Sequence, residues 1–228
     1  MSKVDGAVLA RPDVRPTNDT ASAATPIRVP APRMRTAHFR IRGTVPYVQA
    51  RFSAKALDKM RDKMLAGTQA KKGTPRKPRD FNDDYEQAQH ISSEEWNGMP
   101  ASAFRAALIS ACRLVGFKMT LAKLAVFVEA DGFDRVDGTP LIKIEGTPEK
   151  MEMAVRNETG VADIRVRPMW REWAATVRIR FDLDQFSLQD VTNLLVRVGL
   201  QVGIGEGRPD SRSSAGMGWG LFDVAGEA

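Results

Sequence analysis

The sequence is poor in the residues that form thiol and metal sites. Its 228 residues include one cysteine, Cys112, and two histidines, His38 and His90. This shortage excludes an intramolecular disulfide and the common zinc sites built from cysteine and histidine. Neither a phosphate-binding P-loop nor a G-x-S-x-G nucleophile motif occurs. We therefore expect no metal, no cofactor and no catalytic centre of these types.

Long apolar runs are also missing. The chain has no stretch of eighteen apolar residues, and its first residues lack the apolar segment of a secretory signal. The single cysteine falls in an apolar stripe at helical spacing, where a buried thiol is expected. These features predict a cytoplasmic protein without a membrane partner.

The bulk composition favours one folded domain with an acidic partner. Hydrophobic residues make up 43% of the chain, the net charge is +6 and the sequence pI is about 9.7. Residues 1–35 contain five of the thirteen prolines. They predict a disordered arm, or an arm that links to a neighbouring subunit. Residues 36–228 are then a single domain with insertions at about 53–97 and 131–169.

Hydrophobic periodicity predicts the order of the elements. We expect strands over residues 38–52 (a pair, or one bent strand), 121–130, 141–145, 161–167 and 170–182, and a closing strand through Trp219, Leu221 and Val224. We expect helices over residues 53–66, 98–116 and 187–198. Ser187 and Asp190 predict a capping box. This order indicates an α+β fold of the ferredoxin-like (RRM-type) βαββαβ kind, an antiparallel sheet with two helices on one face and inserted thumb or hairpin segments. The aromatic signature of RRM domains is absent, so base stacking on the sheet is not expected.

A glycine-rich stretch near the end of the chain is the strongest functional signal. Residues 198–224 hold seven of the eighteen glycines. Arg208 and Arg212 lie between two glycine clusters, one of Gly203, Gly205 and Gly207 and the other including Gly216 and Gly218. Glycine permits positive φ and close backbone approach, and arginine suits phosphate. The stretch is either an anion-binding loop or a hairpin that ends the fold.

Other basic residues are candidate contacts to an anion. Residues 68–79 carry five cations and no acid, and they form either a binding arm or a surface loop. Three arginines on the first strand are either solvated or line a groove. Ser102 and Arg105 lie at the start of a helix, where free N–H groups favour an anion. The candidates are Arg40, Arg42, Arg51, Lys71, Lys72, Arg76, Lys77, Arg79, Ser102 and Arg105.

Two segments resemble the RAMP superfamily, whose members form the backbone of CRISPR effector complexes. Residues 98–108, GMPASAFRAAL, look like its Pro-x-Ser-x-Phe/Leu helix start, and residues 203–220 are similar to its C-terminal G-x-G…G-x-G loop. The resemblance implies that Ser102, Arg105 and the glycine-rich stretch with Arg208 and Arg212 face an RNA backbone. It also implies that the insertion carrying residues 71–79 is a thumb or finger.

By this resemblance we expect a non-enzymatic, sequence-tolerant binder of single-stranded RNA or DNA, with RNA favoured. It would assemble as a homo-oligomeric helical filament, with or without other effector-complex subunits. Three alternatives stay open. The first is a bacteriophage protein that coats single-stranded DNA, the second is a self-assembling structural protein, and the third is a metal-dependent ribonuclease. Some RAMP subunits cut RNA with an aspartate before the first helix, where Asp83 and Asp84 lie in this chain.

Overall fold

A computed structural model describes residues 29–52, 58, 61, 79–156, 160, 162–211 and 216–227. The chain divides into two units, Met1–Ala31 and Pro32–Ala228. Every described helix and strand belongs to the second unit, which combines antiparallel strands with four α-helices in its described part. The predicted α+β class is confirmed.

The larger sheet has seven strands, all joined by antiparallel pairing. Its main path runs β10, β1, β9, β6, β3, while β4 pairs with β9 and β5 pairs with β6. The strands are β1 (Met34–Gly43), β3 (Gly98–Pro100), β4 (Val126–Glu129), β5 (Gly132–Phe133), β6 (Pro140–Glu145), β9 (Ala174–Asp182) and β10 (Phe222–Glu227). The long strands β1 and β9 therefore lie at the centre.

Alternation along β1 separates the two faces of this sheet. Ala37, Phe39 and Ile41 are buried, while Arg40 is half-buried and Arg42 is exposed. The same alternation buries every second residue of β9, namely Ala175, Val177, Ile179 and Phe181. Side chains of a strand alternate between faces, so both strands give one face to the core.

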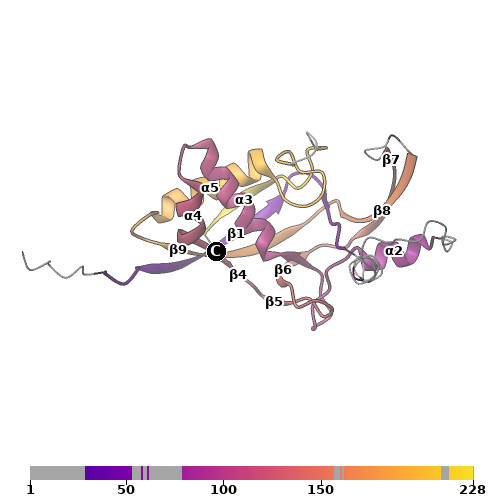
Figure 1. The fold of residues 1–228 in the computed structure, drawn as a ribbon, viewed down its shortest axis with the longest axis horizontal. Coiled ribbons are helices and arrows are strands. Elements are labelled where there is room, and N and C mark those ends of the chain that lie inside the picture. Colours follow the sequence, from indigo (N-terminus) through magenta and orange to yellow (C-terminus); the bar gives the residue numbers. More distant parts are fainter. Residues whose placement is uncertain are drawn as a thin grey trace, which may run out of the picture. The chain divides into compact units, whose positions relative to one another are not determined.

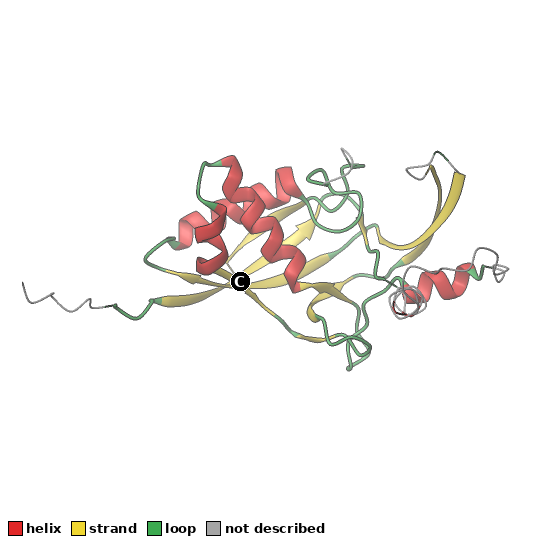
Figure 2. Ribbon diagram, viewed as in Figure 1, coloured by secondary structure: helices red, strands yellow, loops and turns green. Residues whose placement is uncertain are grey.

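Three helices cover the apolar face (Figures 1 and 2). They are α3 (Ala101–Leu114), α4 (Met119–Ala125) and α5 (Leu188–Arg197). Phe104 and Cys112 of α3 and Leu195 of α5 are buried in the same core as the strand residues. Cys112 is a free, buried thiol, as predicted. In the described part of the chain, no helix has the length and apolarity needed to cross a membrane.

The predicted strand over residues 121–130 is wrong in its first half. Residues Met119–Ala125 form α4, and the strand begins only at Val126. Ala122 and Ala125, three residues apart, are both buried, which is helical spacing. Leucine, lysine and alanine are also good helix formers, so local preference and burial favour the same conformation.

Two other predicted boundaries also move. The helix predicted from residue 98 begins at Ala101, because Gly98–Pro100 pairs with β6 as a strand. The single strand predicted over residues 170–182 is two strands, because Trp170 ends β8 and β9 begins at Ala174.

A smaller sheet contains β2 (Tyr47–Val48), β8 (Ala162–Trp170) and β7 (Glu149–Arg156), in the order β2-β8-β7. Figure 1 shows β7 and β8 as a two-stranded ribbon. The short helix α2 (Phe81–Gln87) is joined to the start of this ribbon. Tyr85 Oη donates to Pro148 O at 3.2 Å, and Lys150 Nζ donates to Asn82 Oδ1 at 2.8 Å. Sequence reasoning missed β7 and α2.

Several predictions lie outside the described residues. They are the N-terminal arm up to residue 28, the helix over residues 53–66 apart from two positions, and the cations from Lys71 to Lys77.

The predicted capping box at the start of α5 is confirmed. Ser187 Oγ accepts from the Asp190 N–H at 3.1 Å, and the Asp190 carboxylate accepts from the Ser187 N–H at 2.9 Å. The Asp190 carboxylate also accepts from Ser187 Oγ at 2.7 Å. This bond, and after it the bond from the Ser187 N–H, lowers the pKa of Asp190.

Ser187→Ala is expected to lower the free energy of unfolding by about 1 kcal/mol near pH 7. The pKa of Asp190 is lowered on folding, so the stability that it contributes is present above its unfolded pKa and is lost in acid as the pH falls through the folded value. Urea unfolding at neutral and acidic pH measures both effects. Ser102→Ala, at an exposed position of α3, is the control and is expected to change stability little. An equal loss in both variants would contradict the assignment of the cap.

Candidate functional site

The glycine-rich stretch forms a loop between a short π-helix, η1 (Val198–Val202), and β10. The six glycines between η1 and β10 all have positive φ, between 69° and 81°, namely Gly203, Gly205, Gly207, Gly216, Gly218 and Gly220. The seventh glycine of the stretch, Gly199, lies within η1. Residues with a Cβ rarely adopt this conformation. Residues 212–215, and with them Arg212, lie outside the described part.

The loop folds back on itself through close backbone contacts. Ile204 N donates to Gly220 O at 3.1 Å, and Met217 N donates to Gly207 O at 2.7 Å. A Cβ at Gly220 would lie 1.8 Å from Ile204 O, which no side chain tolerates. Glycine is therefore required at this position both for its φ of 72° and for space.

The segment around β2 supports the loop from one side. Gly220 N donates to Pro46 O at 2.8 Å, and Glu206 N donates to Val48 O at 2.9 Å. A Cβ at Gly205 would lie 2.5 Å from the same Val48 carbonyl oxygen. The described loop backbone is thus held on a second backbone.

A hollow of about 390 Å³ separates the loop from α3. Three alanines and one serine of α3, with Arg113 in its last turn, form one wall, so most of that wall has little side-chain bulk. The lining residues are Ala103, Ala106, Ala107, Ser110, Arg113, Val202, Ile204, Gly205, Arg208 and Asp210. The site therefore exposes helix surface and loop backbone to whatever enters it.

The start of α3 adds free backbone donors near this hollow. Pro100 is the N-cap residue and provides no capping side chain, and Ser102 is exposed in the first turn. The first N–H groups of a helix lack intrahelical partners and favour an anion. Ala103, one residue later, lines the hollow.

Arg105 does not point into the hollow. Its Nε donates to Val126 O at 3.0 Å, and its guanidinium lies 4.9 Å from the ring centroid of Phe127. This arginine joins α3 to β4, although its position at the helix start had suggested an anion contact.

A charged cluster lies at one end of the hollow. Asp210 accepts from Ser110 Oγ and, at 2.9 Å, from Arg113 Nη2. The hydrogen bond from Ser110 is the largest effect on the pKa of Asp210 and lowers it. Burial opposes this shift, and the bond and charge of Arg113 lower the pKa further. Arg208 Nη1 donates to Gly205 O at 3.0 Å. This arginine stays at the loop and lines the hollow.

Glu206 joins the loop to the β7–β8 ribbon. Its carboxylate lies 2.5 Å from Arg167 Nε and 3.2 Å from Arg165 Nη1. The side chain of Glu206 is 22% exposed and that of Arg167 is 23% exposed, so this ion pair is only partly screened by water. Two arginines of the ribbon are thus held beside the loop by one carboxylate.

The three arginines predicted on the first strand have different environments. Arg40 forms a two-bond ion pair with Glu145, which raises the pKa of Arg40 and lowers that of Glu145. Arg42 is exposed on the same face, which carries none of the three covering helices. With Arg40 it lines a second, shallower hollow of about 390 Å³. Arg51 belongs to a separate, buried cluster.

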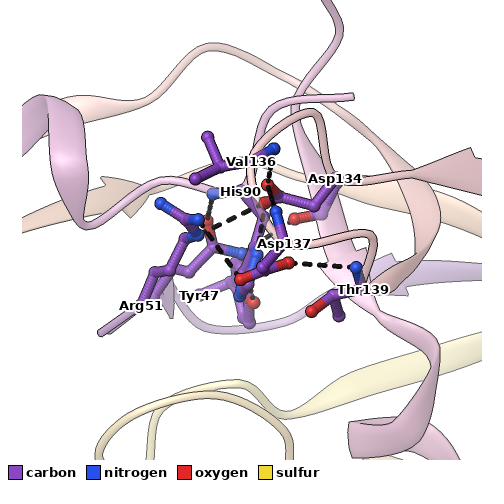
Figure 3. Close-up of polar contacts among 9 residues, drawn as sticks. Tyr47, Arg51, His90, Asp134, Val136, Asp137 and Thr139 are labelled. Atoms are coloured by element: carbon purple, nitrogen blue, oxygen red, sulfur yellow. Dashed lines mark hydrogen bonds and ion pairs between the residues drawn. The ribbon is translucent and has the colours of Figure 1, made fainter. Parts of the chain in front are cut away.

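Figure 3 shows this buried cluster. His90 Nδ1 and Asp134 Oδ2 are 2.7 Å apart, and the Arg51 guanidinium contacts Asp134 at 3.3 Å and Asp137 at 3.2 Å. Burial pushes the pKa of Asp137 upwards, but hydrogen bonds from Thr139 and the charge of Arg51 outweigh it and lower the pKa.

The spacing of His90, Asp134 and Asp137 is that of a possible metal site. However, the side chain of Arg51 is only 6% exposed and pairs with both carboxylates. Its guanidinium already supplies the positive charge that a metal ion would bring. The cluster is therefore best described as an internal ion-pair network that joins the chain after β2 to the turn after β5.

The two candidate catalytic aspartates lie in the first turn of α2. Asp84 pairs with Arg79, which also contacts Asp163 of β8 at 2.9 Å. Asp83 accepts from Gln87 Nε2 at 3.1 Å. Carboxylates at a helix start are stabilised by the helix dipole, so both have a structural role here. Neither belongs to a group of three possible metal ligands among the described residues.

Sequence reasoning missed several residues of the site. Ser110, Arg113 and Asp210 were not singled out, and neither were Glu206, Arg165 and Arg167. The alternating arginines of β8 were a visible signal, but their position beside the loop depends on the ribbon. Comparison of the sequence with models of known protein families, and with curated proteins, gives no match.

The loop glycines provide a test of this geometry. Gly220→Ala is expected to lower the free energy of unfolding by several kcal/mol, because it combines positive φ with a backbone clash. Gly218→Ala is the matched control. Its φ is 75°, but a Cβ there meets nothing within 4 Å, so we expect a loss of only about 1 kcal/mol. Urea unfolding compares the two, and similar losses would show that the loop is not packed as described.

Proposed function

We propose that the chain binds the backbone of single-stranded nucleic acid in the hollow between α3 and the glycine-rich loop, and that it acts without catalysis. One observation carries the proposal. A wall of mostly small side chains faces bare loop backbone. Two arginines and one carboxylate line this hollow, and two further arginines are held beside the loop by Glu206. These charged residues are Arg113, Arg165, Arg167, Arg208, Glu206 and Asp210.

The order of the elements supports the finer fold assignment that we propose. β1, α3, β4, β9, α5 and β10 follow one another in the chain, and their strands lie in the order β10, β1, β9, β4. This is the order of a ferredoxin-like sheet, with the remaining strands as insertions. In a RAMP-like reading of that fold, α3 and the loop would face the nucleic acid.

The chemistry of the hollow favours a flexible polymer of phosphates over a small ligand. The hollow is open to solvent along one turn after another of α3, and the described residues that line it include no aromatic side chain. Backbone amides and arginines contact phosphate and sugar, which carry no base identity. We therefore propose sequence-tolerant binding, of RNA by preference, with neighbouring copies lying along one strand.

The test is a fluorescence anisotropy titration of a labelled single-stranded oligonucleotide with the nuclease-treated full chain. If about three phosphates are neutralised, affinity is expected to fall on the order of tenfold or more between about 50 and 200 mM salt. Absence of binding at low salt would refute the proposal. That result would favour the alternative of a structural protein whose basic residues contact a neighbouring protein.

Ala106→Glu places a negative charge on the exposed α3 wall of the hollow. A like charge near a phosphate costs about 1 kcal/mol or more, so affinity is expected to fall at least about fivefold. Asn193→Glu adds the same charge on the exposed surface of α5 and is expected to leave affinity nearly unchanged. Equal losses in both variants would mean that the hollow is not the binding site.

Glu206→Gln is expected to tighten binding, because it frees Arg165 and Arg167 from their carboxylate while keeping the shape of the side chain. An increase of about threefold or more in affinity follows if one further phosphate contact of about 1 kcal/mol forms. Glu149→Gln, which removes the partner of exposed Arg171, is the control. Weaker binding in Glu206→Gln would show instead that this carboxylate is needed to position the loop.

A further inference from the structure

The α3–loop hollow contains a carboxylate, a group that repels phosphate. Asp210 is the one acidic residue among the described residues that line this hollow. Its side chain is 32% exposed, so the carboxylate is accessible to a ligand there. The hydrogen bond from Ser110 lowers the pKa of Asp210, which keeps the group ionised at neutral pH. Like charges repel, so a carboxylate inside a phosphate site needs an explanation of its own.

The hydrogen bonds of Asp210 use only part of its acceptor capacity. Its Oδ2 accepts from Ser110 Oγ, and its Oδ1 accepts from Arg113 Nη2 at 2.9 Å. An ionised carboxylate accepts about four hydrogen bonds and donates none. Within the described part of the chain, these two bonds leave both oxygens able to accept from a ligand.

Binding of a phosphate to Arg113 would free more of this capacity. The side chain of Arg113 is 58% exposed and lines the hollow beside Asp210. When Arg113 turns to a phosphate, Oδ1 of Asp210 loses its donor. A half-buried charged acceptor without a partner is costly, so a ligand that brings a donor next to its phosphate is favoured over one that does not.

RNA and DNA differ in this respect. The sugar–phosphate backbone of DNA offers only hydrogen-bond acceptors, whereas RNA adds one donor in each nucleotide, the 2′-hydroxyl. In RNA this hydroxyl is on the carbon atom next to the one that bears the 3′-phosphate. The donor and the anion of the RNA backbone therefore lie side by side, as do the acceptor Asp210 and the cation Arg113 in the hollow.

From this match we propose that Asp210 selects RNA over DNA by accepting a hydrogen bond from a ribose 2′-hydroxyl whose 3′-phosphate pairs with Arg113. The selection rests on the proposed function, because it takes place in the same hollow. A carboxylate that accepts from a ribose 2′-hydroxyl is also the contact used in many dinucleotide sites.

The position of the Asp210 carboxylate is fixed from two sides. The backbone N–H of Asp210 donates to Val202 O at 3.1 Å, which holds the residue on the end of η1. The hydrogen bond from Ser110 joins the side chain to α3. A fixed acceptor loses little entropy when a hydroxyl binds to it, which makes the contact selective.

Fluorescence anisotropy with the nuclease-treated full chain measures the selection. The probes are three labelled oligouridylates of equal length, as RNA, as 2′-fluoro-RNA and as DNA. Fluorine keeps the sugar conformation of RNA but cannot donate a hydrogen bond, so the RNA and 2′-fluoro strands differ in the donor alone. The wild type is expected to bind RNA about tenfold or more tightly than 2′-fluoro-RNA, because the hydroxyl contacts a charged acceptor. The loss with DNA is expected to be at least as large.

Asp210→Asn keeps the shape of the side chain and removes its charge. A hydrogen bond to a charged acceptor is about twice as strong as one to a neutral acceptor, so the ratio of the two affinities is expected to fall to about threefold or less. Part of this change is a gain in affinity for the 2′-fluoro strand, because the repulsion of its phosphates is relieved. A residue that only supported the loop would change both affinities in the same direction.

Two control variants separate the carboxylate from its surroundings. Ser110→Ala removes the bond between Asp210 and α3 but keeps the carboxylate, so the ratio of the two affinities is expected to stay near that of the wild type. Asp184→Asn removes a carboxylate that pairs with Arg33 and does not line the hollow. It is expected to change neither affinity. Circular dichroism checks that each variant is folded.

Two results would overturn this proposal alone. They are equal affinities of the wild type for RNA and 2′-fluoro-RNA, and a wild-type ratio in Asp210→Asn. In both cases the chain still binds single strands, so the proposed function stands. Absence of binding to all three strands would refute the proposed function and the selection together.

Discussion

The candidate site depends on one close contact, the approach of the loop backbone at Gly220 to the carbonyl oxygen of Ile204. It returns the chain from the second glycine cluster to the first, directly before β10 begins. Because β10 pairs with β1, a change in this contact is transmitted to the central strand of the larger sheet. The fold and the shape of the hollow are therefore determined by the same few backbone atoms.

The second constraint is that positive charge near the hollow is balanced within the chain. Asp210 and Glu206 hold three of the four arginines, and the fourth, Arg208, is held by a backbone carbonyl. This internal balance keeps long side chains in place before a ligand arrives, which reduces the entropy lost on binding. The same carboxylates compete with a phosphate for these arginines, so binding requires the arginines to exchange a carboxylate for a phosphate.

Much of the framework could be predicted from local patterns. The alternation of Phe39 and Ile41 with arginines predicted a strand over part of β1, and Ser187 with Asp190 predicted the start of α5. Leu121 and Ala122 were misassigned because a short apolar run does not distinguish strand from helix, and the buried spacing of Ala122 and Ala125 is known only from packing. For the site, glycine spacing identified the loop. The roles of Glu206 and Asp210 were not predicted, because the residues that they contact lie about forty and one hundred residues away in the chain.

The link between Glu206 and the ribbon arginines also changes what ionic strength does to the protein. In an ordinary basic groove, each phosphate that pairs with an arginine releases the cations condensed on the nucleic acid. Here Arg165 and Arg167 leave Glu206 when they pair with a phosphate. The carboxylate that they leave attracts a cation from solution, so the net number of ions released is smaller. The number of ions released on binding, measured from the salt dependence of affinity, is therefore smaller than the number of phosphates that the protein contacts. Part of the binding also persists at salt concentrations that dissociate a simple electrostatic complex.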